Sequence, residues 1–195
     1  SMTKALASGE FIIYLQPQYN YKEGKISGAE ALVRWKHPEK GLIPPCDFIP
    51  IFETNGFIIK LDENVWEQVC KLQRKWLDEG LTPLPISVNV SRADLLKGAV
   101  AEKLMGLIEK YDLTPDLLRV EVTESAYMDN PQQLITEIDK LRNNGLLVEM
   151  DDFGSGYSSL NMLKDVPIQV LKTDLKFLDG SGIEARKERI LDSII

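Results

Sequence analysis

The segments "ISVNVS" (86–91) and "LRVEVT" (118–123) decide between the folds open to this chain. In each segment every second residue is apolar, and the residues between are polar. An open sheet covered by helices on both faces should be apolar on both sides of its strands, whereas a barrel can turn a polar side inward near an active-site mouth. The alternation therefore favours a (β/α) barrel over an open, doubly wound sheet.

Strand and helix patterns alternate on both sides of these two segments. Equivalent points of the four apolar strand patterns fall at 86, 118, 147 and 170, a spacing typical of repeated strand–helix units with a parallel sheet. The helix between the predicted strands 117–123 and 146–151 opens with Asn130 as its cap and ends at Gly145. The predicted helices and further segments are 61–77, 94–111, 131–144, a short helix 158–165, strand 170–174 and an amphipathic segment 183–195.

The first two predicted strands are "FIIYLQP" (11–17) and "KISGAEALVRW" (25–35), and the short turn at 19–24 makes them antiparallel. The sequence therefore predicts an α/β fold, a TIM-like (β/α)₈ barrel with an antiparallel first strand. Six strands are visible, and a barrel of this kind needs about 250 residues. We expect the 195 residues to lack roughly the last two strand–helix units.

Composition excludes several classes of protein. With 44% hydrophobic and 27% charged residues, the chain is expected to fold around its own core rather than to be disordered. The net charge of −7, without any Lys/Arg run, argues against binding to duplex nucleic acid. The two cysteines are too few for a disulfide scaffold, and no apolar run approaches the ~18 residues that span a bilayer. We expect a cytoplasmic domain without membrane contact, and Ser1-Met2 is typical of a cloning remnant.

Polar residues on the inward side of the predicted strands gather near the strand ends. Carboxylate and amide oxygens are the ligands that Mg²⁺ and Mn²⁺ prefer, and two such ions would offset the repulsion between neighbouring acids. The residues concerned come from five successive strands of the parallel series and are Glu30, Asn89, Glu121, Asp151 and Lys172, with Asp152 adjacent.

Each of these residues also has a simpler interpretation. Asp152 could cap a following helix, Asn89 could be a turn residue, and Lys172 could be a surface or ion-pair lysine. Their joint placement at matching strand ends is what favours a site for divalent cations.

Six segments of the chain resemble, in order and spacing, the signature segments of EAL-domain phosphodiesterases, which hydrolyse bacterial cyclic di-GMP. No single segment would be specific, but six in register are. They are "EALVRW" (30–35), "FIP" (48–50), "SVNVS" (87–91), "VEVTES" (120–125), "DDFGSGYSSL" (151–160) and "LKTDLKF" (171–177).

The resemblance implies a role for each candidate residue. Two Mg²⁺ or Mn²⁺ ions would be held by Glu30, Asn89, Glu121, Asp151 and Asp152, with Glu30 and Lys172 in catalytic roles and Lys172 positioning the attacking water. Gln16 and Arg34 match positions that bind the substrate, and Glu124 matches the glutamate that braces the glycine loop. The resemblance further implies a single EAL-type domain over 1–195, a bacterial protein, a homodimer, and an upstream sensory or GGDEF-type domain in the full protein.

The sequence also departs from the family pattern. An E-G-V-E segment on a seventh strand and a glutamine on an eighth are absent from the 195 residues. Two functions of different classes therefore stay open: hydrolysis of cyclic di-GMP to the linear guanosine dinucleotide, and a catalytically inactive receptor for cyclic di-GMP. A barrel that uses acids, Mg²⁺ and lysine to abstract a proton beside a carboxylate ranks last, because it gives no role to Arg34.

Overall fold

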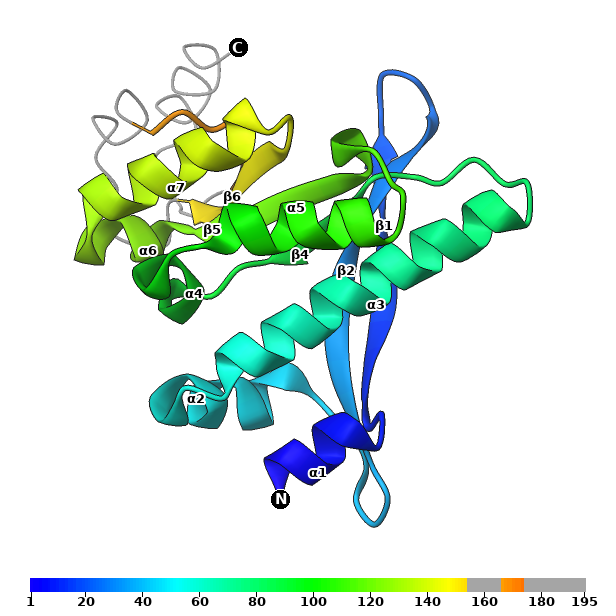
Figure 1. Cartoon of the computed structure of the whole chain (residues 1–195), viewed down its shortest axis with the longest axis vertical. Helices are drawn as coiled ribbons and strands as arrows, with labels where there is room; N and C mark the ends of the chain where they lie inside the picture. The colour runs from blue at the N-terminus through cyan, green and yellow to red at the C-terminus, as the bar shows by residue number, and fades with distance from the viewer. Residues whose placement is uncertain (154–165, 174–195) are drawn as a thin grey trace, which may run out of the picture.

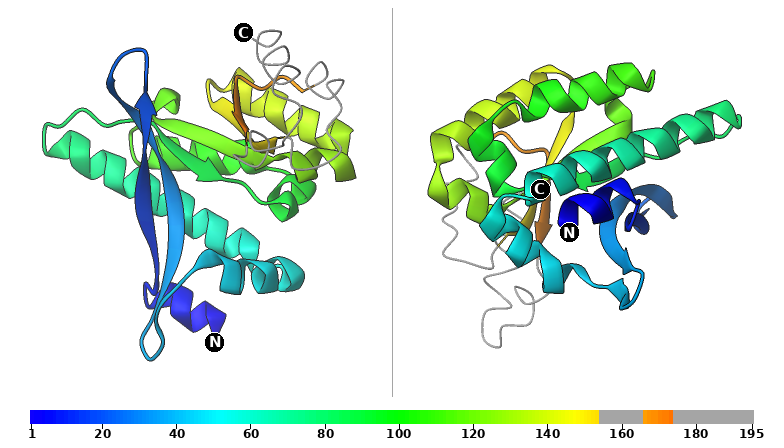
Figure 2. Two further views of the ribbon diagram at one scale, coloured as in Figure 1. Left: turned by 180° about the vertical axis from the view of Figure 1, so that it is seen from behind. Right: turned by 60° about the horizontal axis from the view of Figure 1, so that its bottom comes forward.

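The computed structural model describes residues 1–153 and 166–173. Within them, a mixed sheet is covered on its outer face by helices α3, α5 and α7, which lie side by side (Figures 1 and 2). The strands are β1 (Phe11–Asn20), β2 (Lys25–His37), β3 (Gly41–Ile43), β4 (Ile86–Asn89), β5 (Leu118–Thr123), β6 (Leu147–Phe153) and β7 (Val170–Thr173). The helices are α1 (Met2–Ala7), α2 (Pro45–Asn55), α3 (Ile58–Asp78), α4 (Arg92–Lys97), α5 (Val100–Lys110), the 3₁₀ turn η1 (Pro115–Leu117), α6 (Glu124–Asp129) and α7 (Pro131–Asn143).

The strand order confirms the predicted fold class. Its path is β1-β2-β4-β5-β6-β7, with β3 paired to β2. Strands β2, β4, β5, β6 and β7 pair in parallel, and β1 runs antiparallel to β2. The β1–β2 turn forms as its sequence predicts, because Gly24 adopts a φ of 65° and its N–H donates to the Asn20 carbonyl at 2.9 Å.

The alternation in β4 and β5 divides the sheet into an apolar and a polar face, as predicted. The apolar side chains pack under the helices with exposed fractions of 4% or less, and they are Ile86, Val88, Val90, Leu118, Val120 and Val122. The polar series, which includes Ser87, Asn89, Arg119 and Glu121, points to the opposite face. The hydrophobic core thus fixes which side of the sheet carries the polar residues.

The single helix predicted over 94–111 is wrong, because the structure contains two helices there. Helix α4 is capped by Ser91, whose side chain accepts a hydrogen bond from the Asp94 N–H, and ends at Gly98. Gly98 and Ala99 have φ values of 77° and 66°, so the backbone leaves the helix before α5 begins. Gly98 therefore ends one helix where the sequence predicts a single continuous one.

Other elements were not predicted. Helix α2 begins with Pro45, whose missing N–H costs nothing in the first turn, and contains Pro50 in its interior. Helices α1 and α6 and strand β3 are also additional. The predicted helix 158–165 and segment 183–195 lie outside the described residues. Over the described part of the chain, none of the helices combines the length and apolar character that crossing a membrane would need.

Candidate active site

Four of the predicted site residues meet at the polar face of the sheet, each from a different strand. Glu30 comes from β2, Asn89 from β4, Glu121 from β5 and Lys172 from β7. The register places Asn89 beside Glu121, and Glu30 lies beside Ser87, two residues before Asn89. The parallel register therefore assembles residues that are far apart in sequence.

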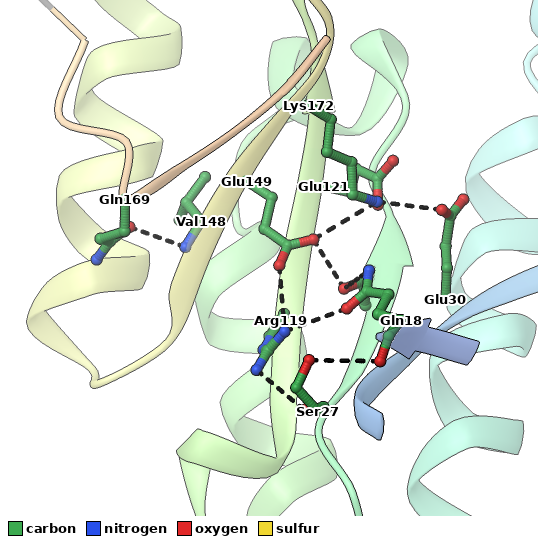
Figure 3. Close-up of polar contacts among 10 residues, drawn as sticks. Gln18, Ser27, Glu30, Arg119, Glu121, Val148, Glu149, Gln169 and Lys172 are labelled. Carbon is green, nitrogen blue, oxygen red and sulfur yellow. Dashed lines mark hydrogen bonds and ion pairs between the residues drawn. The ribbon is translucent and has the colours of Figure 1, made fainter. Parts of the chain in front are cut away.

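Lys172 lies at the centre of this group (Figure 3). Its Nζ atom donates hydrogen bonds to Glu30 Oε2 at 3.1 Å and to Glu121 Oε2. Asn89 Nδ2 donates a longer hydrogen bond to Glu30 Oε1 at 3.5 Å. The side chains of Lys172 and Glu30 are 22% and 21% exposed, and Asn89 is exposed, so the group is partly open to solvent.

Burial sets the charge of Glu121. The residue is 1% exposed, and loss of hydration raises its pKa to about 8 although the hydrogen bond and charge of Lys172 act in the opposite direction. The negative charges of Glu30 and Asp151 add to the increase. For Lys172, burial disfavours the ammonium form, but the hydrogen bonds and charges of Glu121 and Glu30 outweigh burial and raise the pKa. Near neutral pH the structure thus has a charged lysine and a Glu121 that readily holds a proton.

Asp151 and Asp152 differ in their surroundings although they are adjacent. The β6–β7 register shifts between Met150 and Phe153, so the two aspartates occupy an irregularity of the strand. Asp151 is half-buried beside Thr123 and close enough to raise the pKa of Glu121. Asp152 is exposed and has a φ of 56°, a conformation that aspartate tolerates better than most residues. The two adjacent acids thus differ in burial, Asp151 being half-buried and Asp152 exposed.

The proposed substrate-binding residues lie on the β1–β2 hairpin. Gln16 is exposed and pairs in register with Glu30. Arg34 has the same strand parity as Glu30 but lies four residues further along β2, roughly 13 Å away at about 3.3 Å per residue. Its guanidinium lies 5.9 Å from the Tyr14 ring centroid and donates to the Val33 carbonyl at 2.9 Å. The hairpin therefore offers polar groups along a path that leads away from the acids.

Glu124 begins α6 directly after β5 and is 4% exposed. Its predicted contact, the glycine loop at 154–160, lies outside the described residues. The role of Glu124 in bracing that loop therefore stays a prediction.

Sequence reasoning missed Glu149, which is buried in β6 at 1% exposed. Its Oε2 accepts a hydrogen bond from Ser87 Oγ at 2.8 Å and lies 3.6 Å from Lys172 Nζ, and its Oε1 lies 3.5 Å from Arg119 Nη1 (Figure 3). A signal was present in the sequence: Glu149 shares the parity of Asp151. The strand-end pattern does not single out Glu149, because it precedes Asp151 by two residues.

The donor set fits a hard divalent cation, although the described residues do not contain a ready-made cage. No group of three or more His, Cys, Asp or Glu side chains in 1–153 and 166–173 has an arrangement that could hold an ion. The Lys172 ammonium takes the place between Glu30 and Glu121 instead. Glu121 Oε1, however, is buried and lacks a hydrogen-bond partner within the described structure. A cation would satisfy this oxygen, since carboxylate oxygens are what Mg²⁺ and Mn²⁺ bind.

A cavity of about 760 Å³ adjoins the group through Asn89. Its other walls come from β2, from helices α2, α3 and α4, and from the β5–α6 junction at Thr123 and Ser125. Volumes of this size accommodate ligands larger than a single nucleobase. Of the candidate site residues, Asn89 lines this cavity, whereas Glu30, Glu121 and Lys172 do not.

Comparison with known proteins gives a consistent result. The family model described as EAL domain matches residues 1–195. The chain is 37% identical to the signaling protein YkoW of Bacillus subtilis over its whole length, and 35% identical to the cyclic di-GMP phosphodiesterase PdeR of Escherichia coli over 91% of its length. It spans only 24% and 27% of those two proteins.

Solved structures share the fold. A structure titled PaMucR phosphodiesterase, c-di-GMP complex, has a TM-score of 0.86 at 33% identity, covering 99% of this chain and 78% of that one. The EAL enzyme Bd1971, in a form bound to cAMP and cyclic di-GMP, has a TM-score of 0.85 at 30% identity, covering all of this chain and 54% of that one. These neighbours share both the arrangement of strands and a recognisable part of the sequence.

Proposed function

The chain belongs to the EAL domain family, and on this premise we propose that it hydrolyses cyclic di-GMP to the linear guanosine dinucleotide in a reaction that depends on divalent cations. The names of its relatives support the substrate: PdeR is named a cyclic di-GMP phosphodiesterase, and MucR of Pseudomonas aeruginosa a bifunctional diguanylate cyclase and cyclic di-GMP phosphodiesterase.

One observation carries the proposal: Glu30, Asn89, Glu121 and Lys172 converge from four strands on the polar face of the sheet. A phosphodiester is anionic and resists hydroxide attack, so a chain with a net charge of −7 needs cations at the point of reaction. A cluster of oxygen donors is the means to gather them.

The site residues would have separate roles in this reaction. Glu30, Asn89, Glu121, Asp151 and Asp152 would hold two Mg²⁺ or Mn²⁺ ions. When bound, the ions would supply a water of lowered pKa and neutralise charge on the phosphate. Lys172, with its raised pKa, keeps an ammonium beside these acids and orients the water by hydrogen bonding. Arg34 presents a planar fork suited to a phosphate, and Gln16 hydrogen-bonds the substrate from the neighbouring strand.

A second candidate is a receptor that binds cyclic di-GMP without hydrolysing it. The observation in its favour is the ion pair of Lys172 with Glu30 and Glu121, which occupies the place where a cation would be coordinated. A lysine that stays there would block ion binding while leaving Arg34 and Gln16 available to the ligand.

The whole protein is longer than this chain in the relatives named above, and one of them carries a diguanylate cyclase name. This supports the proposal that a sensory or GGDEF-type domain accompanies the EAL domain. A homodimer and a cytoplasmic location stay predictions.

Incubation with cyclic di-GMP, followed by chromatography of the products, tests the proposal on the whole protein. We expect the linear dinucleotide with Mg²⁺ or Mn²⁺ and no product after treatment with a chelator. Tight binding by calorimetry without any product, at saturating Mg²⁺ and Mn²⁺, would refute hydrolysis and establish the receptor function.

Ion binding is expected to strengthen as the pH rises toward about 8. The pKa of Glu121 is raised to about 8, so below that pH an ion must displace its proton. One displaced proton makes the apparent affinity for Mg²⁺ rise about tenfold per pH unit, levelling off above the pKa. Calorimetry between about pH 6 and 9 measures the effect. The Glu121→Gln control should bind more weakly and lose most of this slope, whereas an equally flat dependence in the unaltered chain would contradict the expectation.

A further inference from the structure

Glu149 is an acid at the site that has no role in the function proposed above. In the β5–β6 register it lies directly beside Glu121, and two residues further along the same strand comes Asp151, a proposed ion ligand. Glu149 is therefore level with Glu121 in the sheet and precedes Asp151 by two residues. At 1% exposed it is as buried as Glu121.

Glu149 belongs to a network that fixes its carboxylate in place. Ser87 Oγ donates to Oε2 at 2.8 Å, and Arg119 Nη1 lies 3.5 Å from Oε1. Arg119 in turn donates to Gln18 Oε1 at 3.2 Å and to the Ser27 carbonyl at 3.5 Å (Figure 3). Partners on two other strands, β4 and β5, thus hold Glu149, so its position does not depend on Lys172.

Ion binding would deprive Lys172 of its carboxylate partners. This step of the inference rests on the proposed function. Of the described residues, three carboxylates lie around its Nζ: Glu30 at 3.1 Å, Glu121 within hydrogen-bonding distance and Glu149 at 3.6 Å. Divalent cations would take the oxygens of Glu30 and Glu121 and would repel the ammonium. Without another anion, the Lys172 ammonium would leave the site in the ion-bound state, in which it is proposed to orient the attacking water.

We propose that Glu149 is a positioning residue that retains the Lys172 ammonium in the site when divalent cations occupy Glu30 and Glu121. The 3.6 Å between Glu149 Oε2 and Lys172 Nζ already permits an ion pair. A small shift of Nζ away from Glu121 would complete a hydrogen bond from Lys172 to Glu149. Ser87 and Arg119 already hold the two carboxylate oxygens of Glu149, so we assign it to Lys172 rather than to an ion.

The competing explanation is that Glu149 serves only to neutralise Arg119. The two explanations differ in a double variant. Glu149→Gln leaves Arg119 without its ion pair, and Glu149→Gln/Arg119→Gln restores the charge balance of that pair. If neutralising Arg119 is the only role, the double variant recovers the lost activity. If Glu149 retains Lys172, the double variant stays impaired.

A test that needs no turnover observes the Lys172 ammonium directly by proton–nitrogen correlation NMR. The ammonium signal persists only while hydrogen bonds slow the exchange of its protons with water. The Lys172→Met variant identifies the signal, because it lacks it. We expect the unaltered protein to keep it on addition of Mg²⁺. Glu149→Gln should show it without Mg²⁺, because Glu30 and Glu121 still hold the lysine, and lose it with Mg²⁺. A signal that persists in Mg²⁺-loaded Glu149→Gln would overturn the inference.

Kinetics of the whole protein complete the test. We expect Glu149→Gln to lower kcat about 10- to 100-fold, the range for removing a group that orients a site residue, with KM and Mg²⁺ affinity within about twofold of the unaltered protein. Full kcat in the single variant, or its recovery in the double variant, would refute the role of Glu149 while leaving the proposed function intact. Absence of hydrolysis by the unaltered protein would refute the proposed function itself, and the inference with it.

Discussion

Glu30→Ala is expected to lower the rate of cyclic di-GMP hydrolysis by about 10³-fold, a size typical of removing one group that stabilises the developing charge. Glu30 links the other residues of the site: Oε1 accepts from Asn89 and Oε2 from Lys172. Alanine removes an ion ligand and a partner of the lysine together. Initial rates from chromatography at saturating Mn²⁺ measure the effect.

Glu23→Ala is the matched control. Glu23 lies in the β1–β2 turn, where its exposed side chain pairs with Lys25 at 2.9 Å, and an exposed pair of this kind contributes little. The control should hydrolyse cyclic di-GMP at the unaltered rate. The thermal unfolding midpoint of Glu30→Ala should stay close to that of the unaltered chain. A Glu30→Ala variant that keeps more than about a tenth of the activity while folded would contradict the assignment of Glu30.

Lys172→Met is expected to separate ion binding from catalysis. Without ions, the variant leaves the carboxylates of Glu30, Glu121 and Glu149 without their shared cation. We expect the free energy of unfolding to fall by about 3 kcal/mol. This is the lower end of the range for breaking a buried ion pair, because Glu121 can take up a proton and so lose its unpaired charge. Mg²⁺ should restore the stability, since it replaces the missing positive charge.

The same variant should bind Mg²⁺ more tightly than the unaltered chain, because no ammonium competes for Glu30 and Glu121. Its kcat should nevertheless fall by about 10²- to 10⁴-fold, the range for a group that assists proton transfer. Calorimetry with Mg²⁺, urea unfolding and initial rates measure the three effects. Weaker ion binding by Lys172→Met would show that the lysine does not occupy an ion position, and would remove the physical basis of this expectation.

Much of the fold follows from local patterns that the sequence makes visible. Alternation in 86–91 and 118–123 predicts the apolar and polar faces correctly, because side chains of a strand point to opposite sides. The turn before Lys25 predicts the antiparallel hairpin. The helix break at Gly98 and Ala99 is not predictable from such a pattern. Apolar residues continue at helical spacing across it, whereas the backbone at both residues has a positive φ.

The sequence predicts which residues meet at the candidate site better than it predicts the contacts between them. Strand ends at matching register bring Glu30, Asn89 and Glu121 together, and this requires only the strand order. The ion pair of Lys172 with two of these acids depends on side-chain geometry, which strand spacing does not determine. Glu149 was overlooked for a related reason: a buried acid in the middle of a strand is expected only when its cationic partners, here Arg119 and Lys172, are known.

Anomalous diffraction from crystals of the protein grown with Mn²⁺ would locate the ions themselves. We predict two manganese peaks about 3.5–4 Å apart. Glu30, Asn89, Glu121 and Asp151 should contribute oxygen ligands, with Asp152 on the second ion and Lys172 displaced toward Glu149. At saturating Mn²⁺, an anomalous map with no peak at these residues, and Lys172 still between Glu30 and Glu121, would contradict the proposed two-ion site.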